Sequence, residues 1–145
     1  MTAQSYHLEF GGYWREPNRG GIPNQSGIYS VYTSTYNASA QTVSLHKLVY
    51  IGESENVRDR IEGHEKWPAW RRHLQLGQQL SFSYAPIAGG RERAEAAMIF
   101  RHKPPENDEY VDNFPYERTT ITTAGRNALL AQRFTVETSR AATLW

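Results

Sequence analysis

The chain of 145 residues has no cysteine, no long apolar segment and almost no net charge. Without cysteine it cannot form disulfides, zinc–thiolate or iron–sulfur sites, or a thiol nucleophile. No stretch approaches the run of about 18 apolar residues that a membrane helix needs. Residues 1–9 also lack the basic and apolar regions of a signal peptide. We therefore expect a soluble, cytoplasmic protein with no membrane partner.

The small net charge, at first sight, disfavours a polyanionic partner. The chain carries 16 Lys and Arg against 15 Asp and Glu, a net charge of +1, whereas nucleic-acid-binding domains are commonly strongly basic. The charge is unevenly distributed, however. Residues 104–118 hold five acidic residues and one arginine, a local charge of −4 that leaves +5 for the rest. The composition is therefore compatible with DNA and predicts weak non-specific binding that is sensitive to salt.

Length and composition predict a single domain over residues 1–145, since the chain is long enough for one core and has no internal repeat. Residues 1–26 mix aromatics with turn formers, which indicates an irregular N-terminal lead-in. Residues 27–107 form the expected core and residues 108–145 a C-terminal extension; the acidic segment 106–117 spans the boundary between them.

The pattern of the core predicts alternating strands and helices. Segments rich in β-branched and aromatic residues predict strands at 27–33, 48–51 and 80–84, and a last strand at 133–138. Asn56 is the expected N-cap of a helix from Val57, and further helices are expected at 68–77 and 91–103. The polar segment 34–46 is interpreted as an inserted loop. The predicted fold class is α/β, with a small mixed or antiparallel central sheet of three strands flanked by helices.

Two short motifs at the starts of the core strands carry the functional signal. Gly27-Ile28-Tyr29 begins the first strand and Tyr50-Ile51-Gly52 ends the second. Ten and fourteen residues after Tyr50 come Arg60 and His64. Glu95 then precedes Pro104 by nine residues and Asn107 by twelve, and Ile99 occupies an apolar position between them. In order and spacing, these residues resemble the GIY-YIG nuclease family over about residues 27–107.

The residue types suit phosphodiester hydrolysis in their own right. Hydrolysis needs an activated water and stabilisation of the charge that develops on the phosphoryl and leaving oxygens. Arg60 and His64 are four residues apart and therefore share one helix face. Arginine is permanently charged and can bind two phosphate oxygens. Glu95 is the expected metal ligand, because Mg²⁺ keeps several waters and needs only one or two carboxylates. One divalent ion, Mg²⁺ or Mn²⁺ in its place, is the expected cofactor.

The resemblance implies a role for each residue. Tyr29 positions or deprotonates the attacking water, His64 accepts the tyrosine proton, and Tyr50 orients the water or phosphate. Arg60 stabilises the transition-state charge and Asn107 supports the region around Glu95. Some family members carry a lysine just after the second motif, where this chain has Glu53. That departure favours His64 as the proton acceptor; a second metal contact by Glu53 is the weaker alternative.

Each residue also has an ordinary interpretation. The two tyrosines could be strand aromatics, Arg60 a surface residue paired with Asp59 or Glu62, and Glu95 an exposed helix former. The basic residues of the third helix either follow the phosphates or form a solvated face. Together with one cation of the first helix they are the candidate substrate-binding residues: Arg58, Arg91, Arg101 and Lys103.

The function predicted from these observations is a metal-dependent DNA endonuclease. A compact restriction or phage-defence enzyme is favoured, because the 34–46 insertion occurs in relatives of that type. Such enzymes often cut as homodimers, so a second copy is a candidate partner. The alternatives are a stand-alone repair nuclease acting on branched or single-stranded DNA, and a catalytically silent module that binds nucleic acid or protein. RNA stays open as a substrate, and base specificity is not readable from the sequence.

Overall fold

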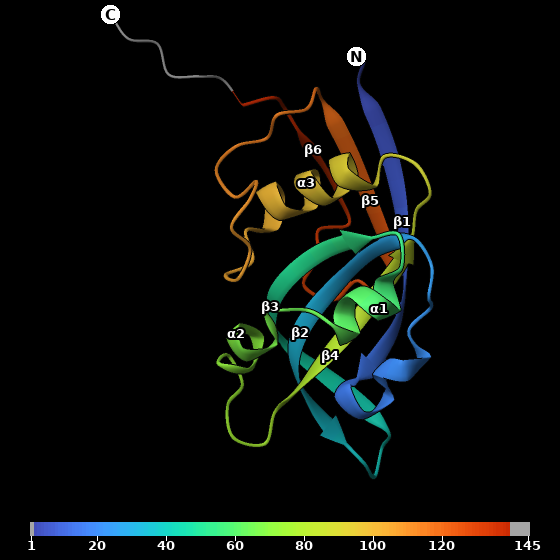
Figure 1. Cartoon of the computed structure of the whole chain (residues 1–145), viewed down its shortest axis with the longest axis vertical. Coiled ribbons are helices and arrows are strands. Elements are labelled where there is room, and N and C mark those ends of the chain that lie inside the picture. Colours follow the sequence, from blue (N-terminus) through green and yellow to red (C-terminus); the bar gives the residue numbers. More distant parts are fainter. Residues whose placement is uncertain (1, 140–145) are drawn as a thin grey trace, which may run out of the picture.

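The computed structural model describes residues 2–139, which form one sheet with short helical connections (Figure 1). The strands are β1 (Gln4–Arg15), β2 (Gly27–Asn37), β3 (Thr42–Ser54), β4 (Gln79–Pro86), β5 (Thr119–Gly125) and β6 (Arg133–Val136). The helical segments are the 3-10 helix η1 (Glu16–Gly21) and the α-helices α1 (Val57–Glu62), α2 (Trp67–Arg71) and α3 (Arg91–His102). Within residues 2–139, no helix combines the length and the apolar character needed to cross a membrane.

The six strands lie in the order β3-β2-β4-β1-β5-β6 and form a mixed, curled half-barrel (Figure 1). β2 is antiparallel to both β3 and β4, and β5 is antiparallel to β6. The long strand β1 connects the two halves of the sheet. Its first half, Gln4–Phe10, runs parallel to β5, and its second half, Gly11–Arg15, runs antiparallel to β4. The chain's N-terminal segment is therefore central to the sheet.

The prediction of a three-stranded sheet flanked by helices is wrong. The three expected strands are present as β2, β3 and β4, but they make up only half of a six-stranded sheet. The expected lead-in is mainly strand β1; its pair of glycines, Gly11 and Gly12, lies at the point where the strand changes partners and is not a loop. Glycine inside a strand commonly marks such a bend.

Two further strand segments were missed because they are polar. Most of the expected loop 34–46 continues the β2–β3 hairpin, with pairing from Ser34–Leu45 to Asn37–Thr42. β5, which has the sequence TTITTAG, was not predicted at all. Threonine is β-branched and favours strands, but the expected alternation of apolar and polar residues is weak in both segments.

The core consists of two clusters of buried residues on opposite faces of the sheet. One cluster contains Tyr29, Val31 and Phe82 of β2 and β4 and packs against α1 and α2 through Val57, Ile61 and Trp70. The other contains Leu8, Ile28 and Ile51 and packs against α3 through its small residues, with Met98 and Ile99. Because the two clusters use different helices, α1 and α3 lie on different sides of β3.

A substitution at Leu8 tests whether β1 is part of the folded core. Leu8 is fully buried against α3 and the neighbouring strands, so Leu8→Ala should lower the free energy of unfolding by about 2–5 kcal/mol. The matched control is Ser5→Ala, an exposed position on the same strand, which should change it by less than about 0.5 kcal/mol. Urea denaturation of both variants measures the difference. Equal stabilities would show that β1 does not pack as described.

Candidate active site

Five of the six predicted catalytic residues line one pocket of about 440 Å³. They come from four elements and one connection: Tyr29 from β2, Tyr50 from β3, Arg60 from α1, Glu95 from α3 and Asn107 from the segment after α3. β3 is an edge strand of the sheet, so residues of α1 on one side of it and of α3 on the other can line the same pocket. Residues that span 78 positions of sequence therefore meet at one place.

The two glycines of the predicted motifs are needed for close packing around the tyrosines. A Cβ atom at Gly52 would lie 2.3 Å from both Cζ and Oη of Tyr29, its register partner on the neighbouring strand. A Cβ atom at Gly27 would lie 2.3 Å from the ring of Tyr84 and 2.4 Å from the carbonyl of Ala85. Real Cβ atoms do not approach this closely. Gly52 thus lets the Tyr29 ring lie flat across β3 and reach the pocket.

Both tyrosines that line the pocket have hydroxyl groups with raised pKa values. Tyr29 is 1% exposed, and burial, followed by the nearby Tyr50, raises its pKa well above the ordinary value. Burial and the Glu95 carboxylate raise the pKa of Tyr50 to about 12. The Tyr29 hydroxyl makes no hydrogen bond to any other residue within 2–139. At neutral pH, Tyr29 is therefore a neutral hydroxyl that is open to a water molecule or a ligand.

His64 does not line the pocket but packs behind the tyrosines. Its ring centroid lies 5.2 Å from that of Tyr50, 6.5 Å from Tyr29 and 4.5 Å from Trp70. Nδ1 accepts a hydrogen bond of 3.0 Å from the main-chain N–H of Lys66. The proton of the neutral ring is then on Nε2, which is buried without a partner in the described part of the chain.

This environment does not favour the predicted role of His64 as the acceptor of the Tyr29 proton. Its accepting nitrogen is already used, and burial together with the nearby Arg60 charge lowers the pKa of His64 to about 4. A group with that pKa is a weak base at neutral pH. Glu65 Oε2 also lies 3.0 Å from Nδ1, a contact that becomes an ion pair only when the ring is protonated. The geometry favours a packing role, with His64 supporting Tyr50.

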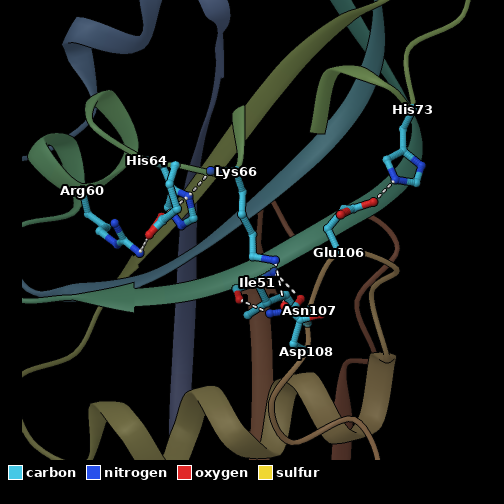
Figure 2. Close-up of polar contacts among 9 residues, drawn as sticks. Ile51, Arg60, His64, Lys66, His73, Glu106, Asn107 and Asp108 are labelled. Atoms are coloured by element: carbon cyan, nitrogen blue, oxygen red, sulfur yellow. Dashed lines mark hydrogen bonds and ion pairs between the residues drawn. The ribbon is translucent and has the colours of Figure 1, made fainter. Parts of the chain in front are cut away.

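The Asn107 side chain forms its hydrogen bonds with the edge strand β3 and not with Glu95. Its amide nitrogen donates to the carbonyl of Ile51 at 2.8 Å, and its Oδ1 accepts from the N–H of Ile51 at 3.0 Å (Figure 2). The preceding residue, Glu106, donates its main-chain N–H to the carbonyl of Val49 at 3.1 Å. The chain after α3 therefore adds to the free edge of β3, beside Tyr50 and Gly52. Asn107 thus supports the site by holding its strand.

Glu95 combines burial with nearby negative charge. Burial is the main reason that its pKa rises to about 8, and the carboxylates of Glu53 and Glu109 raise it further. A bound cation would relieve this repulsion and favour the ionised form. Among residues 2–139, no three His, Asp or Glu side chains gather into a cage for a metal ion. A metal at Glu95 would therefore depend on water and substrate oxygens for most of its ligands.

Several charged pocket residues were missed from the sequence. Lys66 lines the pocket and binds Asp108, with 2.9 Å between Nζ and Oδ2 (Figure 2). Arg60 binds Glu65, with 3.0 Å between Nη2 and Oε1. In addition to Glu95, four acids line the pocket: Glu53, Glu92, Asp108 and Glu109. The lining is therefore acidic overall, since only Arg60 and Lys66 carry positive charge there.

The four predicted substrate-binding residues lie outside the pocket lining. Arg58 donates to the carbonyl of Ile22 at 2.7 Å. Arg91 binds Glu53, which weakens the alternative that Glu53 is a metal ligand, and also donates to Ser26 Oγ at 3.0 Å. Lys103 donates to the carbonyl of Val111 and covers the ring of Phe100. Arg101 is exposed on α3. Three of the four thus have structural partners.

No known protein family, curated protein or solved structure matches this chain. The interpretation of the site therefore depends on its own residues and geometry.

Gly52→Ala tests the close approach of Tyr29 to β3. The new Cβ would overlap the ring, so we expect loss of the Tyr29 packing, a melting temperature lower by about 5 °C or more, and altered near-UV circular dichroism. Gly89→Ala is the matched control, because a Cβ at Gly89 meets no atom within 4 Å. A Gly52→Ala protein as stable as the control would contradict the described Tyr29 position.

Glu95→Gln tests the raised pKa of the pocket carboxyl. The folded protein holds the Glu95 proton up to about pH 8, whereas an unfolded glutamate releases it near 4.3. The folded state binds more protons between these values, so wild-type stability falls as pH rises through this window. Glutamine does not titrate, so the stabilisation by Glu95→Gln should grow from about pH 4.5 to about pH 8 and then level off.

Melting temperatures of both proteins in metal-free buffer from pH 5 to 9 measure this difference. Glu55→Gln, at an exposed position, controls for the general loss of one negative charge. A difference between Glu95→Gln and wild type that is constant across this pH range would show that Glu95 titrates as an ordinary carboxyl.

Proposed function

We propose that the pocket hydrolyses phosphodiester bonds and that the protein is a metal-dependent endonuclease of the GIY-YIG type acting on DNA. The observation that supports this is the meeting of Tyr29, Tyr50, Arg60, Glu95 and Asn107 in one pocket. The family resemblance of the sequence points to these residues, and they come from elements on both sides of the edge strand. The predicted fold class is wrong, but the elements that supply these residues, β2, β3, α1 and α3, are all present.

Arg60 and the two tyrosines would each have a different role in hydrolysis. Arg60 carries a permanent positive charge at the pocket wall and is the group that would stabilise the phosphoryl oxygens in the transition state. The Tyr29 hydroxyl, which is free and un-ionised at neutral pH, would hold the attacking water. Tyr50, packed beside it at a centroid distance of 6.2 Å, would orient the water or the phosphate.

Glu95 is the residue that would hold the metal ion. A half-buried carboxyl with a pKa of about 8 and other carboxylates nearby suits a hard divalent cation such as Mg²⁺ or Mn²⁺. When bound, the cation would neutralise the acidic lining and act as a Lewis acid toward a phosphate oxygen. Glu95 must lose its proton to bind a metal, so metal affinity should rise with pH.

The position of His64 does not favour the expected transfer of the Tyr29 proton to its ring. The Nδ1 atom of His64 accepts a hydrogen bond from the main-chain N–H of Lys66, and the pKa of His64 is about 4. We therefore assign His64 a supporting role behind the tyrosines. Tyr29 then acts by positioning the water, and the proton leaves toward solvent at the open pocket. A compact restriction or phage-defence role stays the preferred biological context, with a repair nuclease as the alternative.

Cleavage of a supercoiled plasmid tests the proposal. We expect cleavage with Mg²⁺ or Mn²⁺ and none with EDTA. Arg60→Ala and Glu95→Ala should each reduce the rate at least about 100-fold, because each removes charge stabilisation at the reacting phosphate. Arg72→Ala is the control for loss of one exposed arginine, since Arg72 lies outside the pocket lining, and it should retain activity.

Full activity in either Arg60→Ala or Glu95→Ala would overturn the assignment. Folded wild-type protein that binds DNA but cuts neither duplex, single-stranded nor branched substrates with any metal would instead identify a silent binding module. Comparing the three substrates separates the restriction and repair contexts.

A further inference from the structure

Each positive side chain that lines the pocket is held by a carboxylate at the protein surface. Arg60 pairs with Glu65 and Lys66 pairs with Asp108. In both pairs the acid is the more exposed partner. The side chains of Glu65 and Asp108 are 66% and 84% exposed, against 40% for Arg60 and 27% for Lys66. The carboxylates are therefore free to turn into solvent, while the cations stay at the pocket wall.

The two cations are anchored by the main chain around them. Arg60 lies in α1, and Lys66 is the N-cap residue of α2. The main-chain N–H of Lys66 donates to His64, which is 4% exposed. In Figure 2 the Lys66 side chain extends from this position across β3 toward Asp108, beside Asn107. Asp108 directly follows Asn107, which binds Ile51. Lys66 and Asp108 thus face each other from two firmly held pieces of chain.

We propose that Glu65 and Asp108 occupy the phosphate positions on the pocket cations Arg60 and Lys66 in the free protein and that a phosphodiester replaces them. Lys66 is then a second substrate-binding cation beside Arg60, and Asp108 is the acid that masks it. This inference rests on the proposed function, because the displaced carboxylates mark where the anionic oxygens of a nucleic acid bind.

The exchange is physically reasonable because the pairs are individually weak. Ion pairs at exposed positions contribute little to stability, since solvent screens them. A phosphate offers anionic oxygens that accept charge-assisted hydrogen bonds from both arginine and lysine. The pocket therefore stays closed to weakly bound anions, whereas a polyanionic chain held at several points can compete with the internal acids. Removing one of these acids should strengthen DNA binding.

Asp108→Asn and Glu109→Gln form a matched pair for this test. Both acids are exposed and line the pocket, but of the two, within residues 2–139, only Asp108 forms an ion pair with a pocket cation. The probe is a fluorescein-labelled DNA duplex of about 20 base pairs, read by anisotropy in EDTA, so that no cleavage is needed. Asp108→Asn should lower the Kd about three- to fivefold, and Glu109→Gln less than about twofold.

A Lys66→Gln background separates unmasking from simple repulsion. If Asp108 acts by masking Lys66, Asp108→Asn should have no effect on the Kd once Lys66 is removed; a double-mutant cycle measures this coupling. Glu65→Gln should lower the Kd as Asp108→Asn does, because it frees Arg60 from its carboxylate partner. Glu55→Gln is the control for this variant. An unchanged Kd in Asp108→Asn, an equal gain in the Lys66→Gln background, or no binding by any variant would overturn the proposal.

The binding assay is independent of catalysis. A protein that shows this pattern but never cuts DNA would retain the inference and lose the nuclease assignment. A protein that cuts DNA while Asp108→Asn and Glu109→Gln bind equally would lose the inference alone.

Discussion

The two hydrogen bonds between the Asn107 side chain and the main chain of Ile51 join the two halves of the site. β3 is an edge strand, and its free edge would otherwise expose unpaired main-chain groups. Asn107 satisfies both groups of one residue and so fixes the segment after α3 against the strand that carries Tyr50 and Gly52. Glu95 and Asp108, on either side of that segment in sequence, are thereby brought to the same pocket as Tyr29 and Arg60. The helices α1 and α3 themselves pack in separate cores on opposite faces.

Burial and the strongest neighbouring charges shift the pKa of Glu95, Tyr50 and His64 in the same direction, toward the neutral form. Burial holds the proton on Glu95 and on both tyrosines, and it keeps His64 neutral. Positive charge is available only from Arg60 and Lys66, each of which already has a carboxylate partner. The free pocket therefore holds little net field that could attract an anion. A divalent cation would change this, because it would displace the Glu95 proton and offset the surrounding acids at once. In the proposed function, metal binding and substrate binding would thus be linked through charge.

The sequence predicted which residues meet in the pocket better than it predicted the fold. The spacing that carries the resemblance reflects short local elements: Asn56 caps α1 as predicted, and α3 spans Arg91–His102 close to the expected range. The fold was missed because β1 and β5 do not alternate clearly, and because the parallel pairing of β1 with β5 joins segments more than 100 residues apart. The Lys66–Asp108 pair was missed for a similar reason, since its members are 42 residues apart and share no motif. The tautomer of His64 depends on a main-chain contact that no side-chain pattern encodes.

Several of the basic residues that balance the acidic ones in this nearly neutral chain are bound to partners inside the protein. Arg93, on the same helix α3 as Arg91 and Arg101, is 8% exposed and binds Thr119 and the carbonyls of residues 2, 117 and 118. Arg58 and Arg91 are likewise bound to internal partners. Side chains held in this way are not available for direct contacts with a phosphate backbone. In the proposed function, direct phosphate contacts would then come mainly from the pocket, where a correctly placed phosphate and metal would replace internal partners. Such a site would bind DNA weakly along its length and strongly only where the reacting phosphate fits.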